Sequence, residues 1–470
     1  MNTSNDRSRP RPTRAARRRR LCAFLIAAAL STTCNSTAWA ASNIDSLRED
    51  GVIGEVPQFN DRAAFGAVGG ESPGTDSLAP LTLSELVDTA LRANAQLHSM
   101  RARYEAMQQR PIQERKLPNP MFQYGGMDVV KKGSWPNTSE KRFMVTQEFP
   151  WFGKLGLRGE VATKEAEAMQ REYEAMVREV IMMVKESYFD LYAVQRSLAI
   201  TRAEEDVLEQ MQKIAEAKYT VGEVAQQDVL KAQTEISMLQ QRLYELEQEE
   251  VVTKAKLNQL LDRRADSPLG FAATEPQHEF DLKTEELFSL ADKMRPEIKK
   301  AQADIQRNQA ERNLMKREYF PDYRLGLEYR SFRVGENMVM FTIGFDLPIW
   351  RTKYRASVRE SEKMIESSQA DLEAVQRQTG FDVQDAWFKL VTARRTLELY
   401  KTALIPQAEA RFQASEAGYR TGKVDFLDLL ESERFLLNVR VMAVMAESNI
   451  GMQQSRLERA VGTDLKPRRP

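Results

Sequence analysis

The sequence predicts a mainly α-helical chain in which one architecture, long coiled-coil helices around a β-hairpin, occurs twice. Three observations predict this fold: an internal repeat with a period of about 200 residues, long proline-free stretches of helical period, and four short segments with strand alternation. A period this long indicates a duplicated half rather than a short-repeat solenoid. We expect the first half at 81–264, the second at 283–464, and a linker at 265–282 between them.

The repeat rests on matching segments in the two halves. The stretch AKYTVGEV at 217–224 matches AGYRTGKV at 417–424, and without a gap Asp228 then falls on Asp428. Upstream, LPN at 117–119 lies over FPD at 320–322. Each half therefore has the same order of strand pair, long helix, glycine turn and second long helix.

Residues 1–40 are predicted to be a secretory signal peptide. Arginines crowd the stretch 7–20, an apolar run follows at 21–30, and the small residues Ala38 and Ala40 precede the expected cleavage site. A basic arm for nucleic acid would explain the arginines but neither of the other features. We expect a linker at 41–80 to follow, and a short tail at 465–470 to close the chain.

Cysteine and charge exclude several functions. Cys22 and Cys34 both precede residue 41, so the mature chain has no disulfide framework, thiolate metal site or cysteine nucleophile. Whether Cys34 is a lipidated N-terminus stays open. Acidic and basic residues balance at 68 each, and removing the arginine-rich signal leaves a mildly acidic chain, which argues against nucleic acid as a partner.

The sequence predicts no enzyme. Its two histidines, His98 and His278, form no metal-binding motif with each other, and the motifs of serine hydrolases and phosphate-binding loops are absent from the sequence. We therefore expect no catalytic residues, no bound metal and no cofactor.

The helical stretches bury a narrow apolar stripe. Between 158 and 219 there is no proline, and apolar residues such as Val180, Val184 and Tyr188 recur at spacings of three and four, as in coiled coils. Pro111 should kink or break the first of the remaining stretches. Those stretches are 83–116, 224–261, 284–318, 353–404 and 424–461. A cytoplasmic coiled-coil filament would fit the helices but not the signal peptide.

Four segments alternate with the period of a β-strand, at about 119–130, 140–149, 322–334 and 337–347. Each has about the length of a tilted transmembrane strand, although a soluble hairpin would alternate in the same way. Four strands cannot close a barrel, whereas three chains would give twelve. In the second pair we expect these residues to face lipid: Tyr323, Leu325, Leu327, Val339, Phe341, Ile343 and Phe345.

Four methionines fall on the opposite parity of these strands, which would face the interior of a barrel: Met121, Met144, Met338 and Met340. Thioethers suit Cu(I) and Ag(I), which would make a path for soft metal ions. Methionine is also a flexible filler of irregular gaps. Both interpretations stay open.

Taken together, the chain resembles the TolC-type outer-membrane efflux channels. The resemblance is carried by the duplicated halves, LTLSELVDTAL at 81–91, LPNP at 117–120 and the two Tyr-x-x-Gly turns followed by aspartate. It implies a homotrimer with one twelve-stranded barrel in the outer membrane of a Gram-negative bacterium and an α-helical tunnel in the periplasm. It also implies an exit duct that docks on an inner-membrane pump through a periplasmic adaptor.

The segment QEFPWFGK at 147–154 is similar to the heavy-metal branch of this family, which implies cation cargo and a pump of the RND type. Multidrug efflux and type I secretion are the alternative roles of such a duct. From another class, a periplasmic adaptor also carries a signal peptide and a helical hairpin. An adaptor is mostly β-structure around one hairpin, whereas here helix dominates and the hairpin occurs twice.

The resemblance places functional residues at the two turns. The periplasmic tip, where adaptors dock, would hold Tyr219, Gly222, Tyr419, Gly422 and Lys423. Asp228, Asp428 and Glu431 would line the aperture, where rings of carboxylates attract cations. The alternative is that these acids only cap and begin helices. Members that lock the tip carry a basic residue where this chain has Val424, so Asp228 lacks an assured partner.

Overall fold

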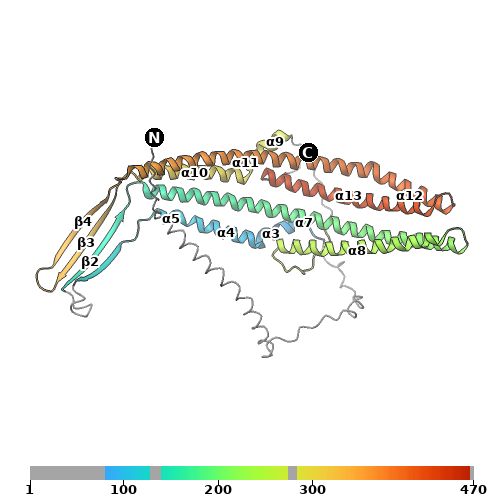
Figure 1. Cartoon of the computed structure of the whole chain (residues 1–470), viewed down its shortest axis with the longest axis horizontal. Coiled ribbons are helices and arrows are strands. Elements are labelled where there is room, and N and C mark those ends of the chain that lie inside the picture. Colours follow the sequence, from blue (N-terminus) through green and yellow to red (C-terminus); the bar gives the residue numbers. More distant parts are fainter. Residues whose placement is uncertain (1–79, 128–138, 274–282, 466–470) are drawn as a thin grey trace, which may run out of the picture. The chain divides into compact units, whose positions relative to one another are not determined.

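The computed structural model describes residues 80–127, 139–273 and 283–465. The expected signal peptide, nearly all of the 41–80 linker and the tail beyond 465 lie outside these residues. Helices make up most of the described part, as predicted, and Figure 1 shows them running alongside one another. They are α3 (Leu83–Ala93), α4 (Ala95–Gln108), α5 (Arg110–Glu114), α7 (Lys154–Thr220), α8 (Gln226–Leu260), α9 (Thr284–Met294), α10 (Pro296–Arg317), α11 (Arg351–Leu399), α12 (Ile405–Arg420) and α13 (Phe426–Val461).

The longest helix, α7, connects the strands to the first glycine turn. Its 67 residues correspond to a length of about 100 Å. It begins after Gly153, which has a φ of 87° that glycine adopts without strain, and it ends just before Gly222. Six other helices, α3, α4, α5, α8, α10 and α13, pack along it, so α7 is covered on several sides.

Two of the expected helices are interrupted, and these expectations were wrong in detail. The stretch 83–116 breaks at Asn94, whose side chain accepts hydrogen bonds from the backbone N–H groups of Gln96 and Leu97 and so caps α4. The stretch 284–318 breaks at Arg295 because Pro296 starts a new helix, α10, at a position where no N–H is needed. Pro111 likewise lies in the first turn of a short helix, α5.

A third helix continues where the sequence predicted an end. We expected 353–404 to stop before Pro406, but α11 passes through a π-helical turn at Tyr400–Leu404 into α12. Proline lacks the N–H that would donate the next hydrogen bond of an α-helix. The wider π-helical turn lets the helix continue without that bond. The second half therefore reaches its glycine turn through two joined helices rather than one.

The strands form one antiparallel sheet in the order β1 (Met121–Met127), β2 (Glu140–Phe149), β3 (Asp322–Phe332) and β4 (Met338–Asp346). The central pair joins the two halves: Phe149 lies opposite Tyr323, and their rings stack with centroids 5.4 Å apart. The edge strands are β1 and β4. Figure 1 shows β2, β3 and β4 side by side.

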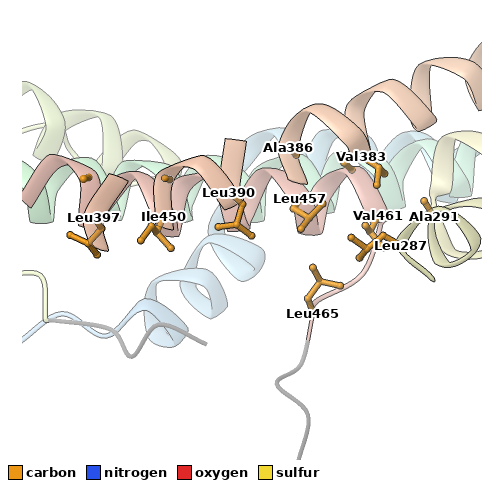
Figure 2. Close-up of a cluster of buried hydrophobic side chains, with 13 residues drawn as sticks. Leu287, Ala291, Val383, Ala386, Leu390, Leu397, Ile450, Leu457, Val461 and Leu465 are labelled. Atoms are coloured by element: carbon orange, nitrogen blue, oxygen red, sulfur yellow. The ribbon is translucent and has the colours of Figure 1, made fainter. Parts of the chain in front are cut away.

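The cores of the two halves are built alike. In the first, Leu86 and Ala90 of α3 pack on Val184, Tyr188 and Leu191 of α7. In the second, α9 contributes Leu287 and Ala291, which pack against side chains of α11 and α13 in the cluster of Figure 2. A short helix thus covers the long helices in each half.

Part of the expected linker between the halves also belongs to the fold. Ala272 pairs with Leu81 in a parallel bridge, and the Tyr188 hydroxyl donates a hydrogen bond of 2.6 Å to the Ala273 carbonyl. In the described part of the chain, no helix combines the length and the apolar character needed to cross a membrane.

Candidate functional site

The two glycine turns have the same backbone. Gly222 and Gly422 have φ values of 77° and 71°, in the left-handed region that glycine adopts readily. In each turn the glycine N–H donates to the carbonyl of the preceding tyrosine, at 3.0 Å for Tyr219 and 3.2 Å for Tyr419. A second bond closes each turn, from Glu223 to the Lys218 carbonyl and from Lys423 to the Gly418 carbonyl. Both turns reverse the chain between long helices.

The tyrosines of the turns lie in different surroundings. Tyr219 is 45% exposed, whereas Tyr419 is only 4% exposed and packs against Phe426, with ring centroids 5.4 Å apart. Burial, and then the nearby charge of Asp228, raise the pKa of Tyr419 to about 12. Its hydroxyl has no hydrogen-bond partner among the described residues. The second turn is therefore part of the core, and the first is surface.

Lys218 joins the two hairpins. Its ammonium group donates to the Tyr419 carbonyl at 2.8 Å and lies 4.9 Å from the centre of the Tyr419 ring. The same group lies 3.6 Å from the Glu223 carboxylate of its own turn. A positive charge at the C-terminal end of α12 is also favoured by the helix dipole. Sequence comparison could not single out Lys218, because Gly418 occupies its place in the second half.

A groove of about 730 Å³ lies between the turns, lined by Lys218, Asp228, Tyr419, Gly422 and Lys423 among others. Of the residues predicted for the tip, Tyr419, Gly422 and Lys423 thus share this groove. Tyr219 and Gly222 are exposed and do not line it. Lys423 is exposed as well. The groove brings basic and acidic side chains together at the ends of both hairpins.

The three acids predicted for the aperture fall into two settings. Asp228 is half-buried, and one of its oxygens lies 3.4 Å from the Lys231 ammonium group of its own helix. Asp428 and Glu431 are exposed and lie three residues apart on one face of α13. Asp425 caps α13, because its carboxylate accepts a hydrogen bond of 2.9 Å from the backbone N–H of Asp428. The side chains of Asp428 and Glu431 are therefore not used as the helix cap.

A buried carboxyl pair lies further along the same helices and escaped the sequence analysis. Glu204 of α7 and Glu433 of α13 are 4% and 1% exposed. Burial, and then the hydrogen bond with Glu204 and its charge, raise the pKa of Glu433 to about 9. The Glu204–Glu433 pair therefore retains a proton at neutral pH. Both glutamates occur in helices rich in acids, so the sequence carried no signal that these two are buried.

Lys154, in the segment 147–154, also has an unexpected place. It is 1% exposed, and its ammonium group lies 3.2 Å from Glu318 and 2.9 Å from Asp322. It also donates to the Phe320 carbonyl at 3.1 Å. A buried charge is tolerated only when it is paired and hydrogen-bonded in this way. Lys154 thus ties the start of α7 to the end of α10 and the start of β3.

The strand register places the seven residues predicted for the lipid side on one face of the sheet. Leu327 lies opposite Phe341, and Leu325 opposite Ile343, so successive rows of the ladder put apolar side chains on the same side. Phe341 is 63% exposed. Gln147, opposite Leu325, is a polar residue on this face. Its apolar and aromatic residues are Phe122 and Tyr124 of β1, Phe143, Val145 and Phe149 of β2, Tyr323, Leu325, Leu327 and Tyr329 of β3, and Val339, Phe341, Ile343 and Phe345 of β4.

The opposite face of the sheet is charged. Glu328 accepts from Arg142 at 2.9 Å and from Arg330 at 2.6 Å, and Arg324 pairs with Asp346 at 2.7 Å. The strand methionines share this face, since both Met144 and Met340 lie opposite Glu328. The sheet therefore separates an apolar face from an ion-paired one.

Comparison with known proteins identifies the family of this chain. A family model described as outer membrane efflux protein matches residues 86–263 and 287–463, one segment in each half. The chain belongs to the outer membrane efflux protein family. The resemblance to TolC-type channels is thereby confirmed, and the protein is an efflux channel of this family.

Relatives and solved structures agree with this family. The efflux protein is 21% identical to the cobalt-zinc-cadmium resistance protein CzcC of Cupriavidus metallidurans, over 78% of this chain and 86% of that protein. The fold is similar to that of CusC, with a TM-score of 0.69 and 17% identity over 81% of this chain and 92% of CusC. The outer membrane protein VceC of Vibrio cholerae is similar to the same degree, over 82% and 97% of the two chains.

Proposed function

We propose that three copies of this efflux protein form one twelve-stranded barrel in the outer membrane of a Gram-negative bacterium, continued by a helical tunnel in the periplasm. The open edges of the sheet, β1 and β4, support the shared barrel, because an unpaired edge is not tolerated in lipid. The exposed apolar face, with Phe341 and Ile343 at its centre, would then contact lipid. The ion-paired face would line the interior.

The outer helices support the same assembly. Within the fold, α8 packs mainly on α7, which leaves its other side free for a neighbouring copy. Large apolar side chains are exposed on α8 and on α11. They include Leu230, Tyr244, Val251 and Val252 on α8, and Phe381 and Leu399 on α11. Burial of such residues between copies is the usual source of stability in an oligomer.

The barrel can be tested by charge on either face of β4. Phe341→Arg would place a guanidinium group in the middle of the bilayer, at a cost of about 2–4 kcal/mol per chain. We expect trimers to be nearly lost from outer-membrane extracts on native gels. Thr342→Arg, one residue along on the ion-paired face, is the matched control and should assemble. Equal yields of trimer from both variants would contradict the proposed orientation of the sheet.

We infer that the cargo is heavy-metal cations, driven by an inner-membrane pump of the RND type through a periplasmic adaptor. The similarity to CzcC across most of both chains carries this inference. The adaptor would dock at the turns formed by Tyr219, Gly222, Tyr419, Gly422 and Lys423. Asp428 and Glu431, exposed on one face of α13, would form two rings of three carboxylates in a trimer and favour cations at the aperture.

Susceptibility of a deletion strain tests the cargo directly. Growth is measured with and without the restored gene on zinc, cobalt, cadmium, copper and silver salts, beside dyes and antibiotics. Sensitivity confined to metals supports the proposal. Sensitivity to organic compounds would assign the protein to multidrug efflux. A deletion strain that grows as well as the restored strain on every compound would favour type I secretion.

The carboxylates at the aperture are tested separately. The double variant Asp428→Asn with Glu431→Gln should lower the cation selectivity of the channel in planar bilayers.

A further inference from the structure

The long helices enclose a second hollow, remote from the turns. It has a volume of about 920 Å³ and is lined from four helices: α7, α8, α11 and α13. Three methionines of α13 line it, together with carboxylates of α7, α8 and α11. These side chains are Met442, Met445 and Met452, with Asp190 of α7, Glu249 of α8 and Asp385 of α11.

The hollow opens on a different side of the helices from the short helices α3 and α9. On α7, Tyr188 and Leu191 pack toward α3, whereas Asp190 and Ser197 line the hollow. On α11, Leu390 packs toward α9, whereas Phe388 lines the hollow. Successive residues of an α-helix are rotated by about 100°, so the side chains that face α3 or α9 and those that line the hollow point in different directions. Since a tunnel must remain open, the proposed trimer would carry α3 and α9 outside and the hollow inside.

The hollow presents thioethers to solvent. Met442 and Met445 are 49% and 40% exposed, and they lie three residues apart, which puts their Cβ atoms about 5–6 Å from each other. Met452 follows two helical turns later on the same side of α13. Flexible side chains at this spacing can bring two sulfur atoms to one ion. Thioethers are ligands for soft cations such as Cu(I) and Ag(I).

Of the three carboxylates that line the hollow, Asp190 and Asp385 pair with lysines, whereas Glu249 of α8 is exposed. Asp385 pairs with Lys389 at 2.7 Å, and Asp190 lies 3.7 Å from Lys256. Burial also raises the pKa of Asp190. Across the described residues, no three histidine, cysteine, aspartate or glutamate side chains are grouped to hold a metal ion. Zinc, cobalt and cadmium prefer groups of such ligands, which one exposed carboxylate does not supply, whereas the neighbouring thioethers suit a softer ion.

We propose that Met442 and Met445 form a weak, transient site for a soft monovalent cation, Cu(I) or Ag(I), on the wall of the tunnel, and that Met452, about 10 Å further along α13, offers the next contact. The proposal rests on the proposed function and narrows its cargo from heavy-metal cations in general to thioether-binding ions. A duct requires contacts that are weak enough to release the ion, and two neutral sulfur ligands without a thiolate meet that requirement.

Silver binding to the purified trimer tests the site. The mature protein, extracted from outer membranes in detergent, is titrated with Ag(I) by calorimetry, and the ligands are identified by X-ray absorption at the silver edge. We expect sulfur ligands in the wild type. The triple variant Met442→Leu, Met445→Leu and Met452→Leu preserves side-chain volume and should weaken binding at least tenfold. Zinc binding should not change.

A second pair of exposed methionines provides the control. Met238→Leu with Met364→Leu removes thioethers of α8 and α11 that lie outside the hollow and should leave silver binding unchanged. The proposal fails if the wild type binds no silver, if the triple variant binds it as well as the wild type, or if the ligands are oxygen. A strain sensitive only to zinc, cobalt and cadmium, with no silver bound, would refute this site and leave metal efflux intact.

Discussion

The two glycine turns share one sequence pattern and one backbone, yet their tyrosines have opposite surroundings. Tyr219 is exposed, whereas Tyr419 is buried beneath Lys218 and beside Phe426. The position of Lys218 holds Gly418 in the second half, and that of Glu433 holds Gln233 in the first. Duplication therefore preserved the reversal of the chain at both turns, while packing between the hairpins made the second turn a structural junction.

The largest expected difference between the turns is the effect of removing each tyrosine ring. Tyr419→Ala should lower the free energy of unfolding by about 3–5 kcal/mol per protomer, because it empties a buried site. Tyr219→Ala should change it by less than about 1 kcal/mol, as an exposed residue does. Chemical denaturation of the trimers in detergent, followed by circular dichroism, measures both.

Tyr419→Phe is the control for the ring. It keeps the apolar contacts and removes a hydroxyl that has no partner among the described residues, so stability should not fall. Equal losses at the two alanine variants would show that the turns are equivalent after all.

The buried Glu433 should make the stability of the protein depend on pH. The pKa of Glu433 is raised from 4.5 to about 9 by burial and by Glu204. Because the folded state holds this proton more tightly than the unfolded state, its contribution to stability is greatest below about pH 4.5. That contribution declines through pH 9, by about 1.4 kcal/mol per pH unit and per protomer.

Glu433→Gln introduces the residue of the first half and should remove this slope in unfolding experiments between pH 6 and pH 8. Gln233→Glu is the converse control. Gln233 is exposed, so a carboxyl group there should introduce no comparable slope. A slope that survives in Glu433→Gln would assign it to another group.

The smallest expected loss of stability comes from replacing the glycine of either turn, and it should be the same at both. Gly222→Ala and Gly422→Ala should each cost about 1 kcal/mol, because alanine is strained at positive φ while the space around both glycines is open. Gly418→Ala should cost more, since an added Cβ would collide with the Val424 side chain. Unfolding of the three variants under one condition would compare them. A large difference between Gly222→Ala and Gly422→Ala would indicate that tertiary contacts enter one turn.

The sequence predicted the features that depend on local pattern. Strand alternation placed Phe341 and Ile343 on one face of a sheet, and the ladder confirms that they share it. The glycine turns followed from the repeat. Breaks at Asn94 and Arg295 were missed because a single capping side chain or a proline in a first turn interrupts a helix without changing its apolar period.

By itself, then, the sequence determined the duplicated halves, the strand faces, the turns and the efflux family, because periodicity and repeat are properties of neighbours along the chain. Only the tertiary structure decided which of two similar tyrosines is buried and which two glutamates meet. It also decided that Lys154 and Lys218 join separate segments and that α13 presents its methionines in a hollow. These outcomes depend on which helices pack together, and burial and charge at one residue are set by partners far away in sequence.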